Sequence, residues 1–216
     1  MKFKLILGSI LAILLSTSAP IFADTDDDYI QLSNDIRNNV AVKNLISKDP
    51  NKVQVLEFFS YGCGACARFE SGFERWQSTI NKNDVIIYRV PVTFNQDEWQ
   101  SLANLYYVMR ALDPDEKLNT KIFAAIHQQG IRLWEESAMR TFFLDNGYTQ
   151  AEFDAAYSQY SNNKAAKNAD AISDVYGINA TPTVIVNGPT GSYLLTISQN
   201  NSDFFNVLNK VIQTAN

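Results

Sequence analysis

The sequence predicts an α/β fold with an inserted helical domain, and three patterns support this. An apolar run at 53–59, an amphipathic helical pattern and a second apolar run at 85–90 follow one another as strand, helix and strand. This order is typical of a parallel crossover unit. Residues 97–176 then have helical spacing, and after them 183–186 and 193–197 flank a turn-forming segment. The last pattern predicts an antiparallel hairpin.

Length and composition place the chain among folded globular proteins. It has 216 residues, of which 46% are hydrophobic and 19% are charged, so we expect one domain or one domain with an insertion. The 18 basic and 23 acidic residues give a formal charge of −5. This balance excludes the basic footprint of a nucleic-acid-binding protein and a polybasic membrane patch.

The first 23 residues have the pattern of a cleaved signal peptide. Lys2 and Lys4 precede an apolar run from Leu5 to Leu15, and small residues follow up to Ala23. A membrane anchor is the weaker alternative, because this run falls well short of the roughly 20 residues that span a bilayer. We expect cleavage after Ala23 and export of a soluble protein whose net charge, without the two lysines, is −7.

The predicted core begins after an acidic, Asn-rich leader at 24–52. Residues 53–59 form a nearly continuous apolar run that ends at Ser60-Tyr61-Gly62, which is typical of a buried central strand. Apolar side chains then recur at steps of three and four residues, at Phe69, Phe73, Trp76 and Ile80. This spacing predicts an amphipathic helix.

Several helices are predicted within 97–176. Thr149 and Glu152 form the capping box of one of them, and the last helix ends at Gly177. We expect Ser202 to cap a closing helix that includes Leu208. The sequence thus assigns 53–96 and 177–216 to one domain and 97–176 to a helical insertion.

The chain has only two cysteines, Cys63 and Cys66. A disulfide between them closes a loop so short that it would stabilise the fold by roughly 2 kcal/mol at best, so a redox role fits better than a structural one. Cys63 lies where the strand ends and the helix begins, a position that favours a thiolate. Cys66 shares the inward face of Phe69 and Phe73. We therefore predict that Cys63 is the exposed nucleophile and Cys66 its sheltered partner.

A metal site is the weaker interpretation of this pair. Zinc is usually held by four ligands, and beyond the two cysteines the chain offers only His127, within the helical insertion. No motif surrounds His127, so we expect a surface or packing residue rather than a catalytic base. We therefore expect no metal and no cofactor.

The segment from Phe58 to Cys66, with Phe69-Glu70 after it, resembles the active-site segment of the DsbA-type thiol:disulfide oxidoreductases of the thioredoxin superfamily. Residues 148–157 and 178–188 resemble later segments of the same family, and the resemblance covers 53–197 in order. It implies a thioredoxin-like fold into which a helical domain is inserted.

The resemblance also implies roles for further residues. Pro182 matches the family's cis-proline, which packs opposite the cysteines, and the backbone of Thr181 would pair with an extended substrate. Tyr61 and Pro182 are expected to line an apolar substrate groove. Glu57 matches a buried acid that is proposed to move protons, and burial in an apolar strand should raise its pKa. The alternative for Glu57 is a carboxylate that faces a wet cavity.

Two features depart from the commonest pattern of the family's oxidases. Gly64 and Ala65 stand between the cysteines, where Pro and His are common, and Thr181 is more familiar from isomerases and thioredoxin-like members. Because a His at this place can help to stabilise the thiolate, we expect a less acidic Cys63 and a less oxidising disulfide. Isomerases of the superfamily are usually dimers with an added N-terminal domain, for which 24–52 is too short. This favours a monomeric oxidase.

The sequence thus indicates an exported, periplasmic oxidase that forms disulfide bonds in reduced or unfolded exported proteins. By resemblance, a membrane quinone-linked partner of the DsbB type would reoxidise Cys63 and Cys66. One alternative is an isomerase or reductase with the same catalytic residues and a different redox potential. Another is a non-redox holdase or adhesion-type protein, which would keep its function without Cys63.

Overall fold

The computed structural model describes residues 29–46, 51–162, 164–197 and 203–216. Its sheet has the strand order β1-β5-β4-β2-β3. β2 and β3 are parallel, whereas β4, β5 and β1 continue the sheet through antiparallel pairs. The strands are β1 (Tyr29–Gln31), β2 (Val53–Phe59), β3 (Val85–Pro91), β4 (Thr183–Gly188) and β5 (Gly191–Thr196).

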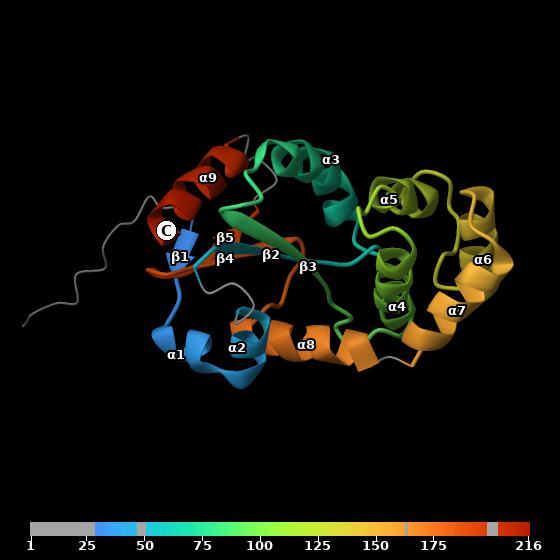
Figure 1. The fold of residues 1–216 in the computed structure, drawn as a ribbon, viewed down its shortest axis with the longest axis horizontal. Helices are drawn as coiled ribbons and strands as arrows, with labels where there is room; N and C mark the ends of the chain where they lie inside the picture. The colour runs from blue at the N-terminus through green and yellow to red at the C-terminus, as the bar shows by residue number, and fades with distance from the viewer. Residues whose placement is uncertain (1–28, 47–50, 163, 198–202) are drawn as a thin grey trace, which may run out of the picture.

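Helices cover both faces of the sheet and form a second body at its side (Figure 1). α3 and α9 lie on one face, α2 and α8 lie on the other, and α4 to α7 form the lateral body. The helices are α1 (Asn34–Asn38), α2 (Val40–Ile46), α3 (Gly64–Thr79), α4 (Asp97–Leu112), α5 (Asn119–His127), α6 (Glu136–Asp145), α7 (Gln150–Tyr160), α8 (Lys164–Tyr176) and α9 (Phe204–Ala215).

This architecture confirms the predicted thioredoxin-like α/β fold with a helical insertion. Every residue of β2 is buried, because helices cover both of its faces, and this is why its sequence is apolar except at Gln54 and Glu57. The Thr149 and Glu152 capping box is present at the start of α7. Gly177 follows α8 with a φ of 66°, the left-handed conformation that favours glycine after a helix.

The structure differs from the sequence analysis at three places. The leader contributes β1, which pairs with β5, and two short helices. α8 belongs to the predicted insertion by sequence, but Ala169 and Tyr176 pack against the sheet in the same core cluster as Leu56 of β2. α9 begins at Phe204 with Asp203 at its N-cap position, and the predicted cap Ser202 lies outside the described residues.

The predicted signal peptide, residues 1–23, also lies outside the described residues. Within the part of the chain that the structure describes, no helix has the length and hydrophobicity needed to cross a membrane.

Candidate active site

Cys63 occupies the junction between β2 and α3. A turn follows β2, in which Cys63 N–H donates to the carbonyl of Ser60 at 3.0 Å and Gly62 N–H donates to Ser60 Oγ at 3.1 Å. Cys63 is the N-cap of α3, and its Sγ accepts a hydrogen bond from Cys66 N–H at 3.2 Å. The strand end, the turn and the helix start therefore place one thiol at the positive end of α3.

The two thiols differ strongly in acidity. Hydrogen bonds from the Cys66 thiol, from Thr181 and from the backbone of Cys66 and Ala65 outweigh burial and lower the pKa of Cys63 to about 5. Burial, followed by the hydrogen bond with Cys63, raises the pKa of Cys66. At neutral pH Cys63 is therefore a thiolate and Cys66 a thiol.

The exposure of the pair corrects one expectation. Cys63 is 9% exposed and Cys66 is 0% exposed, so the order is as predicted, but Cys63 is not an open surface thiol. The turn before it and the loop opposite it cover most of the side chain. Both cysteines are free thiols in this structure, which is the reduced state of the pair.

The loop before β4 lies opposite Cys63. The Thr181–Pro182 peptide bond is cis, as the resemblance implies. Cys63 Sγ lies 3.4 Å from the carbonyl oxygen of Thr181. Pro182 is buried, while Thr181 beside the thiol is partly exposed.

Gly64 and Ala65 form the first turn of α3, between the two thiols. A Cβ added at Gly64 would meet Arg68 Nη1 at 3.7 Å, an ordinary van der Waals contact. Packing does not require glycine at this position.

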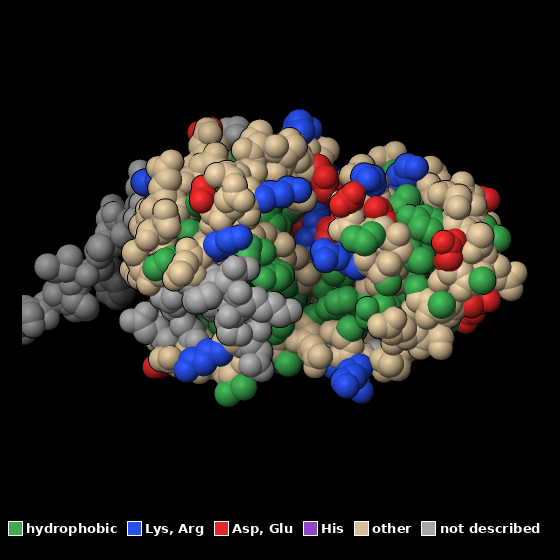
Figure 2. Space-filling view, in the orientation of Figure 1, with side chains coloured by type: hydrophobic (Ala, Val, Ile, Leu, Met, Phe, Trp, Pro, Cys, Tyr) green, Lys and Arg blue, Asp and Glu red, His purple; other side chains and the backbone are tan. Residues whose placement is uncertain are grey.

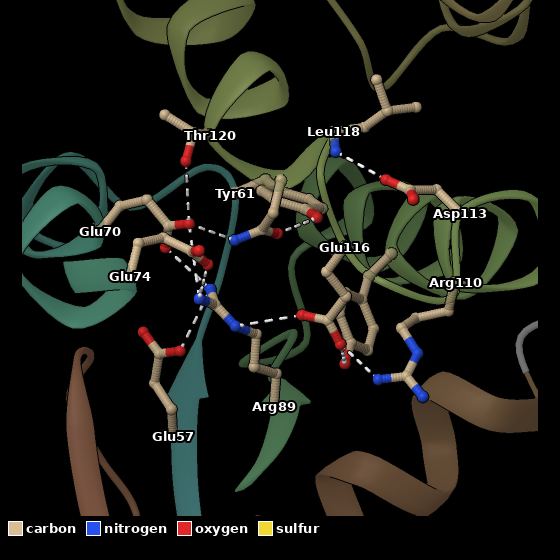
Figure 3. Close-up of polar contacts among 12 residues, drawn as sticks. Glu57, Tyr61, Glu70, Glu74, Arg89, Arg110, Asp113, Glu116, Leu118 and Thr120 are labelled. Carbon is tan, nitrogen blue, oxygen red and sulfur yellow. Dashed lines mark hydrogen bonds and ion pairs between the residues drawn. The ribbon is translucent and has the colours of Figure 1, made fainter. Parts of the chain in front are cut away.

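Glu57 is fully buried and takes part in an ionic cluster centred on Arg89 (Figure 3). Arg89 lies beside Glu57 in the register of β2 and β3, and its Nη1 is 3.3 Å from Glu57 Oε2. Three more carboxylates surround the guanidinium: Glu70 at 2.8 Å, Glu74 at 2.7 Å and Glu116 at 3.2 Å. The alternative of a carboxylate that faces a wet cavity does not fit a side chain with no exposed surface.

Burial raises the pKa of Glu57 to about 8, with further contributions from Glu70, Glu116 and Glu74, while Arg89 opposes the shift. The Glu57 carboxyl is therefore mostly protonated at neutral pH and can act as a proton donor. Arg89 and Glu116 also line a groove of about 470 Å³ beside β3. Figure 2 shows the hollow between the two bodies, with charged side chains of both signs along it.

No sequence pattern predicted this cluster around Arg89. The signal that could have revealed it is Arg89 within an otherwise apolar strand, paired with the strand that contains Glu57. A buried arginine requires anionic partners. The partners on α3 and before α5 could not be assigned from spacing alone.

Tyr61 is 1% exposed, which corrects the expectation that its side chain lines an apolar substrate groove. Its ring packs edge-on against Phe59 and Phe123, and its hydroxyl donates to Asn119 Oδ1 at 2.5 Å. Asn119 Nδ2 in turn donates to Glu70 Oε1 at 2.5 Å. Tyr61 thus connects the active-site turn to the helical insertion and, through Asn119, to the ionic cluster.

His127 is exposed at the end of α5, as expected for a surface residue, but its Nε2 lies 2.8 Å from the carbonyl oxygen of Tyr61. Among the residues that the structure describes, no group of three His, Cys, Asp or Glu side chains is arranged to hold a metal ion.

The chain is similar in sequence to known thiol:disulfide interchange proteins. A thioredoxin family model matches residues 46–202. The thiol:disulfide interchange protein DsbA of Bordetella pertussis is 36% identical over 143 residues, which is 66% of each chain. The DsbA of Azotobacter vinelandii is 30% identical over 189 residues, covering 86% of this chain and 85% of that protein.

Solved structures of other DsbA proteins share the fold. The crystal structure of Pseudomonas aeruginosa DsbA aligns with a TM-score of 0.72 and 23% identity, over 87% of this chain and 92% of that one. That of the oxidoreductase DsbA from Xylella fastidiosa aligns with a TM-score of 0.66 and 26% identity, over 76% and 86% of the two chains.

Proposed function

This chain belongs to the DsbA family of thiol:disulfide interchange proteins, and on that premise we propose that it is an exported oxidoreductase that introduces disulfide bonds into other proteins. The observation that supports this most strongly is the opposite direction of the pKa shifts of Cys63 and Cys66. A thiol with a low pKa is a good leaving group in thiol–disulfide exchange.

The proposed reaction starts from the oxidised pair. A substrate thiolate attacks Sγ of Cys63, the bond between the cysteines breaks, and Cys66 leaves with the electron pair and takes up a proton. A second substrate thiolate then attacks the substrate sulfur of the mixed disulfide, and Cys63 leaves as a thiolate. The substrate loses two electrons and two protons, and Cys63 and Cys66 become reduced. The reaction needs no cofactor.

Other site residues support these steps. The high pKa of Cys66 makes proton uptake on leaving favourable, and the protonated Glu57 is the proposed source of that proton. Thr181 is partly exposed and precedes the cis-Pro182, and its backbone is the proposed place where an extended substrate pairs beside Cys63. Gly64 and Ala65 would tune the redox potential through the first turn of α3.

The setting of the reaction is also part of the proposal. Residues 1–23 would act as a cleaved signal peptide, and the mature protein would work as a periplasmic monomer on reduced or unfolded exported proteins. A DsbB-type, quinone-linked membrane protein would reoxidise the pair. The signal-peptide pattern and the relatives' shared name support these assignments.

The proposal is tested with the oxidised protein and a reduced, unfolded model protein that has two cysteines. The wild type should form one substrate disulfide for each pair that becomes reduced, whereas Cys63→Ser should be inactive. Cys66→Ser cannot form the Cys63–Cys66 disulfide and should not oxidise the reduced substrate either. With a substrate that already contains a disulfide, its Cys63 thiolate should form a persistent mixed disulfide as one substrate sulfur leaves as a thiol. Full function in Cys63→Ser would refute the redox role and support the non-redox alternative.

A further inference from the structure

One face of α5 holds the active-site turn. Asn119, Phe123 and His127 are spaced four residues apart, so they lie on the same side of the helix. All three contact Tyr61: Asn119 accepts from its hydroxyl, Phe123 packs edge-on against its ring, and His127 lies against its carbonyl oxygen. Tyr61 is two residues before Cys63, so these contacts act on the segment that sets the position of the nucleophile.

The hydrogen bond between His127 and the Tyr61 carbonyl can have only one direction. A carbonyl oxygen only accepts hydrogen bonds, so Nε2 of His127 must carry the proton that it donates to Tyr61. This holds for the neutral Nε2–H tautomer and for the imidazolium. The ring also stacks on Phe123, with centroids 6.2 Å apart and an interplanar angle of 26°.

The turn is held from a second direction by α4. A Cβ added at Gly62 would lie 2.6 Å from Nε1 of Trp99, so this side chain packs directly against the backbone between Tyr61 and Cys63. Two helices of the insertion, α4 and α5, therefore contact the turn from Ser60 to Cys63. The turn in turn sets the position of Cys63 Sγ between Cys66 N–H and the Thr181 carbonyl.

We propose that His127 is a positioning residue for disulfide exchange: its hydrogen bond to the Tyr61 carbonyl holds the turn that places Cys63 at the start of α3. The inference rests on the proposed function and assigns to the helical insertion a direct part in it. Without the hydrogen bond, the turn can move, and Cys63 Sγ loses part of the hydrogen bond from Cys66 N–H that stabilises its thiolate.

Two substitutions separate the hydrogen bond from the ring. His127→Phe keeps an aromatic ring over Phe123 but has no donor, whereas His127→Gln has an amide that can donate to the Tyr61 carbonyl. Gln128→Leu, at the exposed next residue, is the control for a change on this surface. The measurement is the acid dissociation constant of the Cys63 thiol, taken from the pH dependence of its alkylation by iodoacetamide between pH 3 and 8 in the reduced proteins, together with thermal unfolding of each.

In His127→Phe, the acid dissociation constant of the Cys63 thiol should fall by about three- to tenfold, the range expected from the net contribution of one hydrogen bond. In His127→Gln it should stay within about twofold of the wild type, as it should in Gln128→Leu. The inference is wrong if the constant of His127→Phe equals that of the wild type, or if it falls as far in His127→Gln as in His127→Phe. It is also wrong if His127→Phe changes only the KM for a reduced peptide, since His127 would then contact substrate instead.

This assay separates the inference from the proposed function. Alkylation reports on Cys63 without any substrate, so the variants can be compared even if the wild type fails to oxidise the model protein. Failure of substrate oxidation with the expected alkylation pattern would refute only the proposed function. Normal oxidation with unchanged alkylation in His127→Phe would refute only the role of His127.

Discussion

Cys63 and Cys66 are chemically alike in the sequence and become different through their positions on α3. Cys63 caps the helix and receives hydrogen bonds, while Cys66 lies one turn later on the buried face. The direction of this difference could be predicted, because it depends only on the strand-to-helix junction and on helical spacing. The low exposure of Cys63 could not, because it depends on the distant Thr181–Pro182 loop.

The raised pKa of Glu57 should make the stability of the fold depend on pH. This pKa is raised to about 8 in the folded protein, so the folded state binds this proton more tightly than the unfolded state does. The resulting contribution to stability is complete below the ordinary pKa of a glutamate and is lost as the pH rises toward 8. Relative to Glu57→Gln, the free energy of unfolding of the wild type should therefore fall by up to about 1.4 kcal/mol per pH unit across this window.

Urea unfolding of both proteins between pH 4 and 9 provides the measurement. The exchange rate of Glu57→Gln should also fall, by about tenfold or more, because Gln cannot supply a proton to Cys66. Parallel stability curves would contradict the pKa shift, and unchanged exchange with normal folding would remove Glu57 from the mechanism.

Single elements were predictable where their signals are local. β2, α3 and the hairpin of β4 and β5 have strong apolar patterns. A recognisable cap marks the start of α7, and another marks the end of α8. β1 was missed because three residues, of which Ile30 is largely exposed, show no period that distinguishes a strand from a loop. Its place in the sheet depends on pairing with β5, far along the chain.

The glycine after α8 should contribute to the stability of the fold through its backbone conformation. Gly177 has a φ of 66°, and a Cβ there would meet no atom within 4 Å, so Gly177→Ala should cost only backbone strain, about 1 kcal/mol of unfolding free energy. Gly177→Asn should cost less, because Asn tolerates this conformation. Urea unfolding checks both variants. A cost for Ala no larger than that for Asn would show that the cap contributes little.

At the scale of the whole molecule, the cluster around Arg89 joins the sheet, α3 and the segment before α5. Its members are separated by up to about 60 positions in the chain, so the sequence shows each charge but not the cluster. The contacts of α4 and α5 with the active-site turn could not be predicted from the sequence either. The insertion was predictable as a set of helices, whereas its contacts with the turn follow only from tertiary packing.

The redox equilibrium of the pair tests the central claim most directly. The measurement equilibrates the protein in defined glutathione buffers, alkylates Cys63 and Cys66, and reads the oxidised and reduced fractions by mobility shift. Because the reduced form contains a stabilised Cys63 thiolate, we predict that it dominates even when oxidised glutathione is abundant. A disulfide that survives in mainly reduced glutathione would contradict the oxidase and identify a reductant or isomerase.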